Sequence, residues 1–158
     1  MADSPNGRRT KETPSEVFIK ELDTLGARFT LIAAKNKLPI EDGWSKKPHR
    51  ADEALRHLYG ADNGNVGLLC GTQSNGYCGL DLDAFKSIFL ETFPQFKDCK
   101  HVYRDNAPER IKFIIHIIDK VPLGNKVSIA ESPAGHHLEI LADATTGGGN
   151  NCVIAGRH

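Results

Sequence analysis

Two acidic residues, Asp81 and Asp83, are separated by one residue in an otherwise apolar run that begins at Gly79. Side chains two positions apart on a β-strand share a face and lie about 6.6 Å apart along it, so a strand here would present both carboxylates together. Adjacent carboxylates repel, and Mg²⁺ or Mn²⁺ relieves that repulsion while leaving coordination positions for substrate phosphates. The spacing favours a metal-dependent nucleotidyl-transfer site. The alternative is a strand end whose acids are solvated or paired with lysines.

A third acid, Glu139, stands on a later segment, 136–141, which alternates between an apolar face and a face that carries His137 and Glu139. Two metal ions bridged by carboxylates can activate a hydroxyl nucleophile and neutralise charge on a transferred phosphoryl group, and three acids suit that task. His136 and His137 would point to opposite faces of a strand, so they would not easily share one ion. One of them is interpreted as a surface histidine.

A clearly alternating segment, 110–118, predicts a strand with one buried side. Its polar face would carry Lys112 and His116. A lysine can hold a triphosphate as a point charge, and Lys112 is the first choice for that role. The apolar face would consist of Ile111, Phe113, Ile115 and Ile117.

The composition is that of an ordinary globular domain. The chain has 158 residues, of which 39% are hydrophobic and 25% charged, enough for one domain with a core. Lys plus Arg and Asp plus Glu both number 20, so no global basic field would hold DNA or an acidic membrane. Any contact with nucleic acid must therefore be local.

Two further features bear on the cellular compartment. No run of about 18 apolar residues is present and no apolar segment follows the N-terminus, so we expect neither a spanning helix nor a secretory signal. The four cysteines contain no C-x-x-C pair, which predicts reduced, mostly buried thiols rather than zinc ligands or disulfides. These cysteines are Cys70, Cys78, Cys99 and Cys152. We therefore expect an intracellular, cytoplasmic protein.

A locally basic segment, 35–50, could meet a phosphate backbone. The only acidic residues in this segment are Glu41 and Asp42. An ordinary solvated loop is an equally weighted alternative to nucleic-acid binding. The cationic residues are Lys35, Lys37, Lys46, Lys47 and Arg50. Trp44, the one tryptophan, lies in the same segment and either stacks on a base or anchors its loop.

Helical and strand patterns alternate along the chain. Residues 1–12 are polar without apolar periodicity and are expected to form a disordered leader ahead of a catalytic domain at 13–158. Thr13 starts a capping box with proline in the first helical position. The predicted helices run from there to Gly26, from 51 to Gly60 and from 85 to 93, and the predicted strands are 28–34, 66–70, 77–83, 101–104, 110–118, 126–130, 136–141 and 152–155. Strands 66–70 and 77–83 are predicted to form a hairpin-like pair.

An ordered series of short motifs runs through about residues 17–158. It comprises Asn36-Lys37-Leu38-Pro39 through Gly43-Trp44, Asn65-Val66-Gly67-Leu68-Leu69-Cys70-Gly71 before Ser74, Gly79-Leu80-Asp81-Leu82-Asp83, His137-Leu138-Glu139-Ile140-Leu141 and Ala155-Gly156-Arg157-His158. In this order the series resembles the primase-polymerase (Prim-Pol) domain of the archaeo-eukaryotic primase superfamily.

The resemblance implies an α/β (α+β) fold, in which an RRM-like mixed, largely antiparallel sheet packs against helices. It implies template-directed synthesis of DNA or RNA from nucleoside triphosphates with Mg²⁺ or Mn²⁺, and it makes Asp81, Asp83 and Glu139 the metal-binding catalytic acids. The expected partners are a DNA template and primer, nucleoside triphosphates, and a replicative helicase domain or protein.

The chain departs from the family pattern at two places. The family has a histidine after a small residue on the strand between the acids, whereas Lys112 stands at that place and His116 follows on the same face. The expected nucleotide-binding set is Lys112, His116, Arg110 and His158, with Lys112 preferred over His116. The family pattern also continues beyond His158, so the domain is interpreted as truncated at its C-terminus.

The sequence therefore predicts a DNA primase/polymerase. One alternative is a non-catalytic nucleic-acid-binding or replication-initiation module on the same fold, which would bind through segment 35–50 without metal. Another is a degenerate domain that retains the fold and acts only by association with another replication protein.

Overall fold

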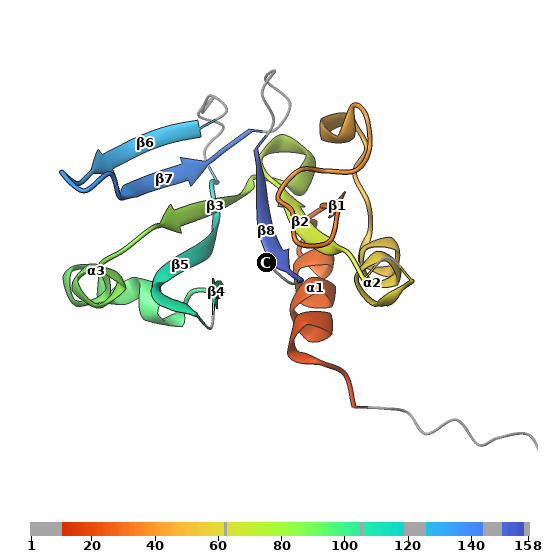
Figure 1. Ribbon diagram of the computed structural model, residues 1–158, viewed down its shortest axis with the longest axis horizontal. Coiled ribbons are helices and arrows are strands. Elements are labelled where there is room, and N and C mark those ends of the chain that lie inside the picture. The colour runs from red at the N-terminus through yellow and green to blue at the C-terminus, as the bar shows by residue number, and fades with distance from the viewer. Residues whose placement is uncertain (1–10, 62, 105, 119–125, 144–149, 157–158) are drawn as a thin grey trace, which may run out of the picture.

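The computed structural model describes residues 11–61, 63–104, 106–118, 126–143 and 150–156 (Figure 1). The first ten residues of the predicted leader and the predicted site residue His158 lie outside these ranges. The described part is a mixed α+β structure with two antiparallel sheets, which confirms the predicted class. None of the described helices is long and apolar enough to cross a membrane.

A three-stranded sheet and two helices form one part of the molecule. The sheet has the order β1-β2-β8, built from Phe29–Ile32, Asn65–Leu69 and Asn151–Ala155. Helices α1 (Pro14–Thr24) and α2 (Ala51–Tyr59) pack against each other, and α2 packs on β1 and β2. The capping box predicted at Thr13 is present in part, since the Thr13 side chain accepts a hydrogen bond from the Glu16 N–H at 3.1 Å.

A five-stranded sheet forms the other part. Its order is β4-β5-β3-β7-β6, and every described pairing is antiparallel. The strands are β3 (Tyr77–Leu82), β4 (His101–Arg104), β5 (Ala107–His116), β6 (Lys126–Glu131) and β7 (His137–Leu141). The strand that carries Asp81 is therefore central, with a neighbour on each side. This arrangement replaces the single mixed sheet that the sequence predicted.

The predicted hairpin between strands 66–70 and 77–83 is wrong. Strand β2 pairs with β1 and β8, so both of its hydrogen-bonding edges are occupied and β3 pairs with β5 and β7 instead. Between β2 and β3 the chain turns through a short 3₁₀ helix, η2 (Thr72–Ser74). The buried Ser74 hydroxyl bonds to the backbone of Arg28 and Leu69, and these bonds hold the turn against the first sheet.

Two apolar clusters lie on opposite faces of β5, and the first of them joins the two sheets. Ile114 packs into the cluster formed by α1, α2 and the three-stranded sheet, whereas Phe113 packs into a second cluster with Leu80 and Leu82. The sequence predicted one buried side for this strand, but both faces are covered at its middle. The reason is that the three-stranded sheet covers one face and α3 (Lys86–Thr92) with η3 (Pro94–Asp98) covers the other.

Gly79 permits the close contact between the two sheets. A Cβ atom at this position would stand 2.8 Å from the Sγ atom of Cys152 on β8, which is closer than real side chains approach. Glycine therefore lets β8 pass directly over β3 (Figure 1). The neighbouring Cys70, Cys78 and Cys152 are buried thiols, as predicted, and burial raises the pKa of Cys78 and of Cys152 to about 11.

Candidate active site

Three charged side chains form one row across the middle of the five-stranded sheet. The Cα partners of Asp81 on β3 are Lys112 on β5 and Glu139 on β7. Directly opposed residues of antiparallel strands share a face, so the three side chains project together. We call this face of the sheet the acid face. The predicted convergence of Asp81, Lys112 and Glu139 on one face is present in the described structure.

The acid face is open at this row because the contact with the three-stranded sheet ends one row earlier. The preceding row consists of Ile114, Gly79 and Leu141, in which Ile114 and Leu141 belong to the apolar cluster under β8. At the charged row, the side chains of Asp81 and Glu139 are 22% and 14% exposed. The apolar cluster therefore ends at the row of Ile114 and Leu141, and the carboxylates of the next row lie half-buried at its edge.

Each of the three predicted acids is paired with a cation. Lys112 Nζ lies 2.9 Å from Asp81 Oδ2, and Lys126 Nζ lies 2.7 Å from Glu139 Oε1. Asp83, directly after β3, forms an ion pair with Arg110. Asp81 and Glu139 are neighbours on the two inner strands, and a lysine on each flanking strand pairs with one of them, which relieves the repulsion between the carboxylates.

The ionisation of Asp83 reflects its two neighbours. Partial burial acts to raise the pKa of its carboxyl, but the hydrogen bond and charge of Arg110 outweigh burial. The backbone N–H of His137, 3.4 Å from Asp83 Oδ2, acts in the same direction. The pKa of Asp83 is therefore held below its ordinary value, and the carboxylate is charged at neutral pH.

His137 lies on the acid face beside Glu139, as the alternation of segment 136–141 predicted. Its Nδ1 atom lies 3.8 Å from Glu139 Oε1, is buried, and makes no hydrogen bond to any described residue. The signal was present in the sequence, because His137 and Glu139 are two positions apart on one strand and must share a face. Lys126 was missed because only the β6–β7 register places it beside Glu139.

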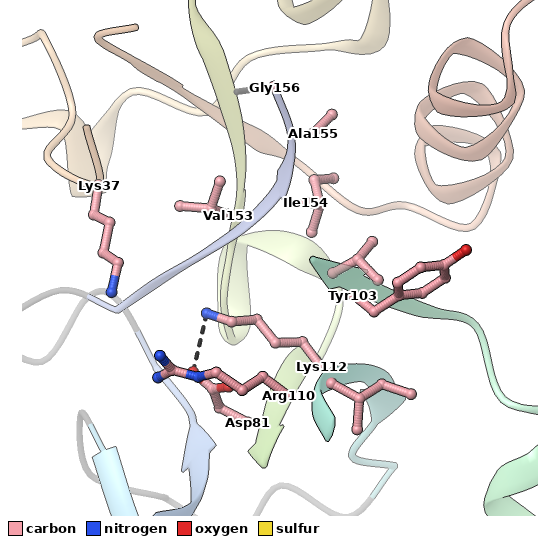
Figure 2. Close-up of a pocket in the computed structure, with 11 residues that line it drawn as sticks. Lys37, Asp81, Tyr103, Arg110, Lys112, Val153, Ile154, Ala155 and Gly156 are labelled. Carbon is pink, nitrogen blue, oxygen red and sulfur yellow. Dashed lines mark ion pairs between the residues drawn. The ribbon is translucent and has the colours of Figure 1, made fainter. Parts of the chain in front are cut away.

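A pocket opens beside Asp81, between the acid face and β8. Its charged lining residues are Lys37, Asp81, Arg110 and Lys112, and its wall includes Val153–Ala155 and Gly156. Figure 2 shows the side chains of Lys37, Arg110 and Lys112 extending into the same space from two separate parts of the chain. Three of the four charged lining residues are cationic, and two of these, Lys112 and Arg110, are paired with Asp81 and Asp83.

The basic segment 35–50 is divided in the structure. Lys37 lines the pocket, whereas the Arg50 guanidinium donates to both carboxylate oxygens of Asp23, with Nε at 2.8 Å from Oδ1. Lys46 and Lys47 lie exposed at the end of the 3₁₀ helix η1 (Trp44–Lys46), and Lys35 is exposed with a positive φ of 56°. Lys37 and Arg50 therefore have different surroundings, and Trp44 is half-buried.

His116, the other candidate for the nucleotide-binding strand, stands apart from the acids. It lies four residues along β5 from Lys112, about 13 Å at the usual strand rise. Its ring stacks on Tyr77 at 4.5 Å between centroids, and its Nε2 lies 2.7 Å from the Asn75 carbonyl oxygen. Arg110 and Lys112 are thus the members of the predicted nucleotide-binding set that the fold brings to the pocket.

The donor chemistry of the acid face fits a divalent cation. Within the described ranges, no three Asp, Glu, His or Cys side chains stand close enough to hold a metal ion in their present pairing. Because Asp81 and Glu139 are directly opposed, their Cβ atoms lie about 4.5–5.5 Å apart. If both side chains rotated away from Lys112 and Lys126, the two carboxylates could contact the same ion. The His137 Nδ1 atom, which makes no hydrogen bond in the described structure, lies 3.8 Å from Glu139 Oε1.

Comparison of the chain with protein-family models, with curated proteins and with solved structures found no match. The resemblance to primase-polymerase domains therefore rests on the ordered motifs of this chain alone. The geometry adds an independent observation, which is the placement of two predicted acids and one predicted phosphate-binding lysine in a single row.

Proposed function

We propose that this chain is a metal-dependent nucleotidyltransferase of the primase-polymerase type, acting on nucleoside triphosphates with a DNA template and primer. The observation that carries the proposal is the row Lys112–Asp81–Glu139 on the central strands, next to a pocket with three cationic groups. A nucleoside triphosphate bound to Mg²⁺ or Mn²⁺ would match both kinds of group in this site. The metal ion would bind the carboxylates, and the triphosphate would bind the lysine and arginine side chains.

The residues of the chain have separate roles in this proposal. Asp81, Asp83 and Glu139 hold the divalent ions, with His137 beside them. When bound, such ions neutralise charge on the α-phosphate and lower the pKa of the attacking hydroxyl. Lys112, Arg110 and Lys37 bind the triphosphate and orient it, because charge-assisted hydrogen bonds to phosphate are strong and directional.

Binding of the proposed substrate would exchange the partners of two ion pairs. Lys112 and Arg110 now neutralise Asp81 and Asp83, so in the proposed complex the phosphates take over the cationic groups and the metal takes over the carboxylates. The exchange keeps every charge compensated as water is displaced, which avoids leaving an unpaired charge in a half-buried site. It also makes metal binding and nucleotide binding mutually supportive.

The decisive experiment is a titration of Mn²⁺ with a labelled nucleoside triphosphate into the wild-type protein and into an Asp81→Ala, Asp83→Ala variant. Asp42→Ala with Asp52→Ala is the matched control, because it removes the same charge from exposed positions outside the site. We expect metal-dependent nucleotide binding in wild type and control and its loss in the site variant. Equal binding in all three proteins, or none in wild type, would refute the proposal.

A second function is compatible with the same ion pairs. Acids that are permanently neutralised by Lys112, Lys126 and Arg110 would also suit a non-catalytic nucleic-acid-binding or replication-initiation module. That protein would bind an oligonucleotide without metal and would tolerate replacement of Asp81 and Glu139. The titration separates the two functions, because only the nucleotidyltransferase couples nucleotide binding to Mn²⁺.

A further inference from the structure

A groove lies on the face of the five-stranded sheet opposite the acid face. It runs between α3, η3 and the edge formed by β4 and β5. Its lining residues are Lys86, Leu90, Phe96, Lys97, His101, Tyr103, Pro108, Ile111 and Phe113. We call it the lysine–aromatic groove. No described acidic residue lines it, so its charge is positive.

The lysines of this groove differ from most other cations of the protein. Neither Lys86 nor Lys97 forms an ion pair with any residue in the described ranges. The nearby Lys100, by contrast, pairs with Glu21. Glu109, next to the lining residue Pro108, accepts a hydrogen bond from the Ser87 hydroxyl at 3.3 Å. Two ammonium groups are therefore available to an external anion on the rim of this groove.

Aromatic rings line the same groove as the two lysines. Phe96 packs edge-on against Phe113, with 5.3 Å between centroids, and forms part of the floor. His101 and Tyr103 lie side by side at 6.4 Å on the edge strand β4, and Tyr103 is 61% exposed. Exposed rings next to unpaired cations suit a ligand that has both flat aromatic faces and phosphates.

We propose that the lysine–aromatic groove binds single-stranded nucleic acid, with Lys86 and Lys97 on the phosphates and Tyr103 and His101 stacked on bases. A polyanion matches the charge of the groove, and an acidic or neutral protein segment would leave the ring faces without a flat partner. The proposed ligand is single-stranded rather than duplex nucleic acid, because bases in a duplex are stacked on one another and do not expose their faces to protein side chains.

The groove also reaches the pocket on the acid face. Tyr103 and Ile111 line both, because β4 is the edge strand and its side chains are accessible from either side. A strand held in the groove therefore leads around β4 toward Lys112 and Asp81. Its identity as a template strand rests on the proposed function, whereas its binding to the groove requires neither metal nor nucleotide.

The test is fluorescence anisotropy of a labelled oligothymidylate of about fifteen nucleotides, without metal or nucleoside triphosphate. The site variant is Lys86→Gln with Lys97→Gln, and the matched control is Lys20→Gln with Arg56→Gln, which removes the same charge from α1 and α2, outside both proposed sites. We expect about tenfold weaker binding by the site variant, and a decrease of about 1.4 in the slope of log affinity against log salt. We expect the control to bind as wild type does.

The aromatic contribution is tested separately from charge. Tyr103→Ala should weaken binding about fivefold or more, and Tyr103→Phe should restore it, because stacking needs the ring and not the hydroxyl. Restoration by phenylalanine would not occur if Tyr103 acted through a hydrogen bond. Circular dichroism of each variant confirms that these exposed substitutions leave the fold intact.

Three results would overturn the proposal. They are no binding by wild type, equal losses in the Lys86/Lys97 and Lys20/Arg56 variants, and equal affinity for duplex and single strand. The Asp81→Ala, Asp83→Ala variant should bind the oligonucleotide as wild type does. Failure of the groove and failure of the nucleotidyltransferase are therefore measured by different variants and in different buffers.

Discussion

The two faces of the five-stranded sheet use positive charge in opposite ways. On the acid face, Lys112, Lys126 and Arg110 are each paired with a carboxylate. In the lysine–aromatic groove, Lys86 and Lys97 have no acidic partner among the described residues, and aromatic rings line the same groove. Side chains that form ion pairs suit a ligand with both positive and negative charge, such as a metal–triphosphate complex. Lysines without an acidic partner suit a polyanion. We therefore expect the two proposed sites to differ in their requirement for metal.

The largest expected effect separates chemistry from strand binding. Replacing Asp81 by Asn and Glu139 by Gln keeps the size of both side chains but removes the charges that would hold metal. We expect nucleotide incorporation to fall on the order of 10³-fold while oligothymidylate binding in metal-free buffer stays unchanged. Primer extension and anisotropy on the same preparation measure both. Parallel loss of both properties would show that the two faces are not independent.

A smaller effect tests the exchange of ion pairs on the acid face. In Lys112→Met, a phosphate contact is lost and Asp81 loses its cation, so nucleotide affinity should fall about tenfold while Mn²⁺ affinity in the absence of nucleotide should rise. Calorimetric titration with each ligand alone gives the two values. If both affinities fell together, Lys112 would be holding the fold of the site rather than competing with metal. Lys97→Met should change neither value.

The next prediction concerns pH and the pair Asp83–Arg110. Since the pKa of folded Asp83 lies below its unfolded value, its contribution to stability is present above about pH 4 and is lost as pH falls through the lower, folded value. Arg110→Met removes the main cause, so the variant should lose less stability over that acidic interval. The pair is partly exposed, which limits the difference to less than about 1 kcal/mol.

Urea unfolding between pH 7 and pH 2.5 measures this difference, and Lys86→Met is the control. Because Lys86 has no acidic partner in the described structure, its replacement should leave the acid dependence of the free energy of unfolding unchanged. Equal acid dependence in wild type and Arg110→Met would contradict the assignment of the Asp83 pKa to that pair. A change in the Lys86→Met protein would show an acid near the groove.

The smallest expected effect uses Cys99 as a natural reporter beside the groove. Cys70, Cys78 and Cys152 are buried and their thiol pKa values are raised, so a water-soluble alkylating reagent should reach Cys99 first. Cys99 follows η3 directly and precedes His101 by two residues. Bound oligothymidylate should slow its modification a few-fold, measured by mass spectrometry.

A nucleoside triphosphate with Mn²⁺ is the matched ligand for the Cys99 experiment. Since its proposed site lies on the other face of the sheet, it should leave the modification rate of Cys99 unchanged. Protection by the nucleotide and not by the oligonucleotide would reverse the assignment of the two faces.

Local patterns in the sequence were sufficient for most of the individual elements. The cap at Thr13 and the apolar spacing after it predicted α1, and the alternation of 110–118 predicted most of β5. The face shared by Glu139 and His137 followed from strand parity alone. Such features depend on residues within one or two turns or pleats, so the sequence contains all the necessary information.

Pairing between distant segments was decided only by the tertiary structure. The sequence predicted that 66–70 and 77–83 pair because they are close in the chain, but both edges of β2 are taken by β1 and β8. The placement of Lys126 on Glu139 and of Lys37 in the pocket depends on the same long-range choices. Short strands with little polar patterning specify their partners weakly.

The sequence by itself determined which residues could do chemistry, namely Asp81, Asp83, Glu139 and Lys112, because residue type and two-residue periodicity are local properties. The tertiary structure decided that Asp81 and Glu139 stand opposite each other, that each acid carries a cation, and that a second, acid-free groove lies behind them. The physical reason is that strand order and register follow from which apolar faces can be buried together, and burial is a property of the whole chain.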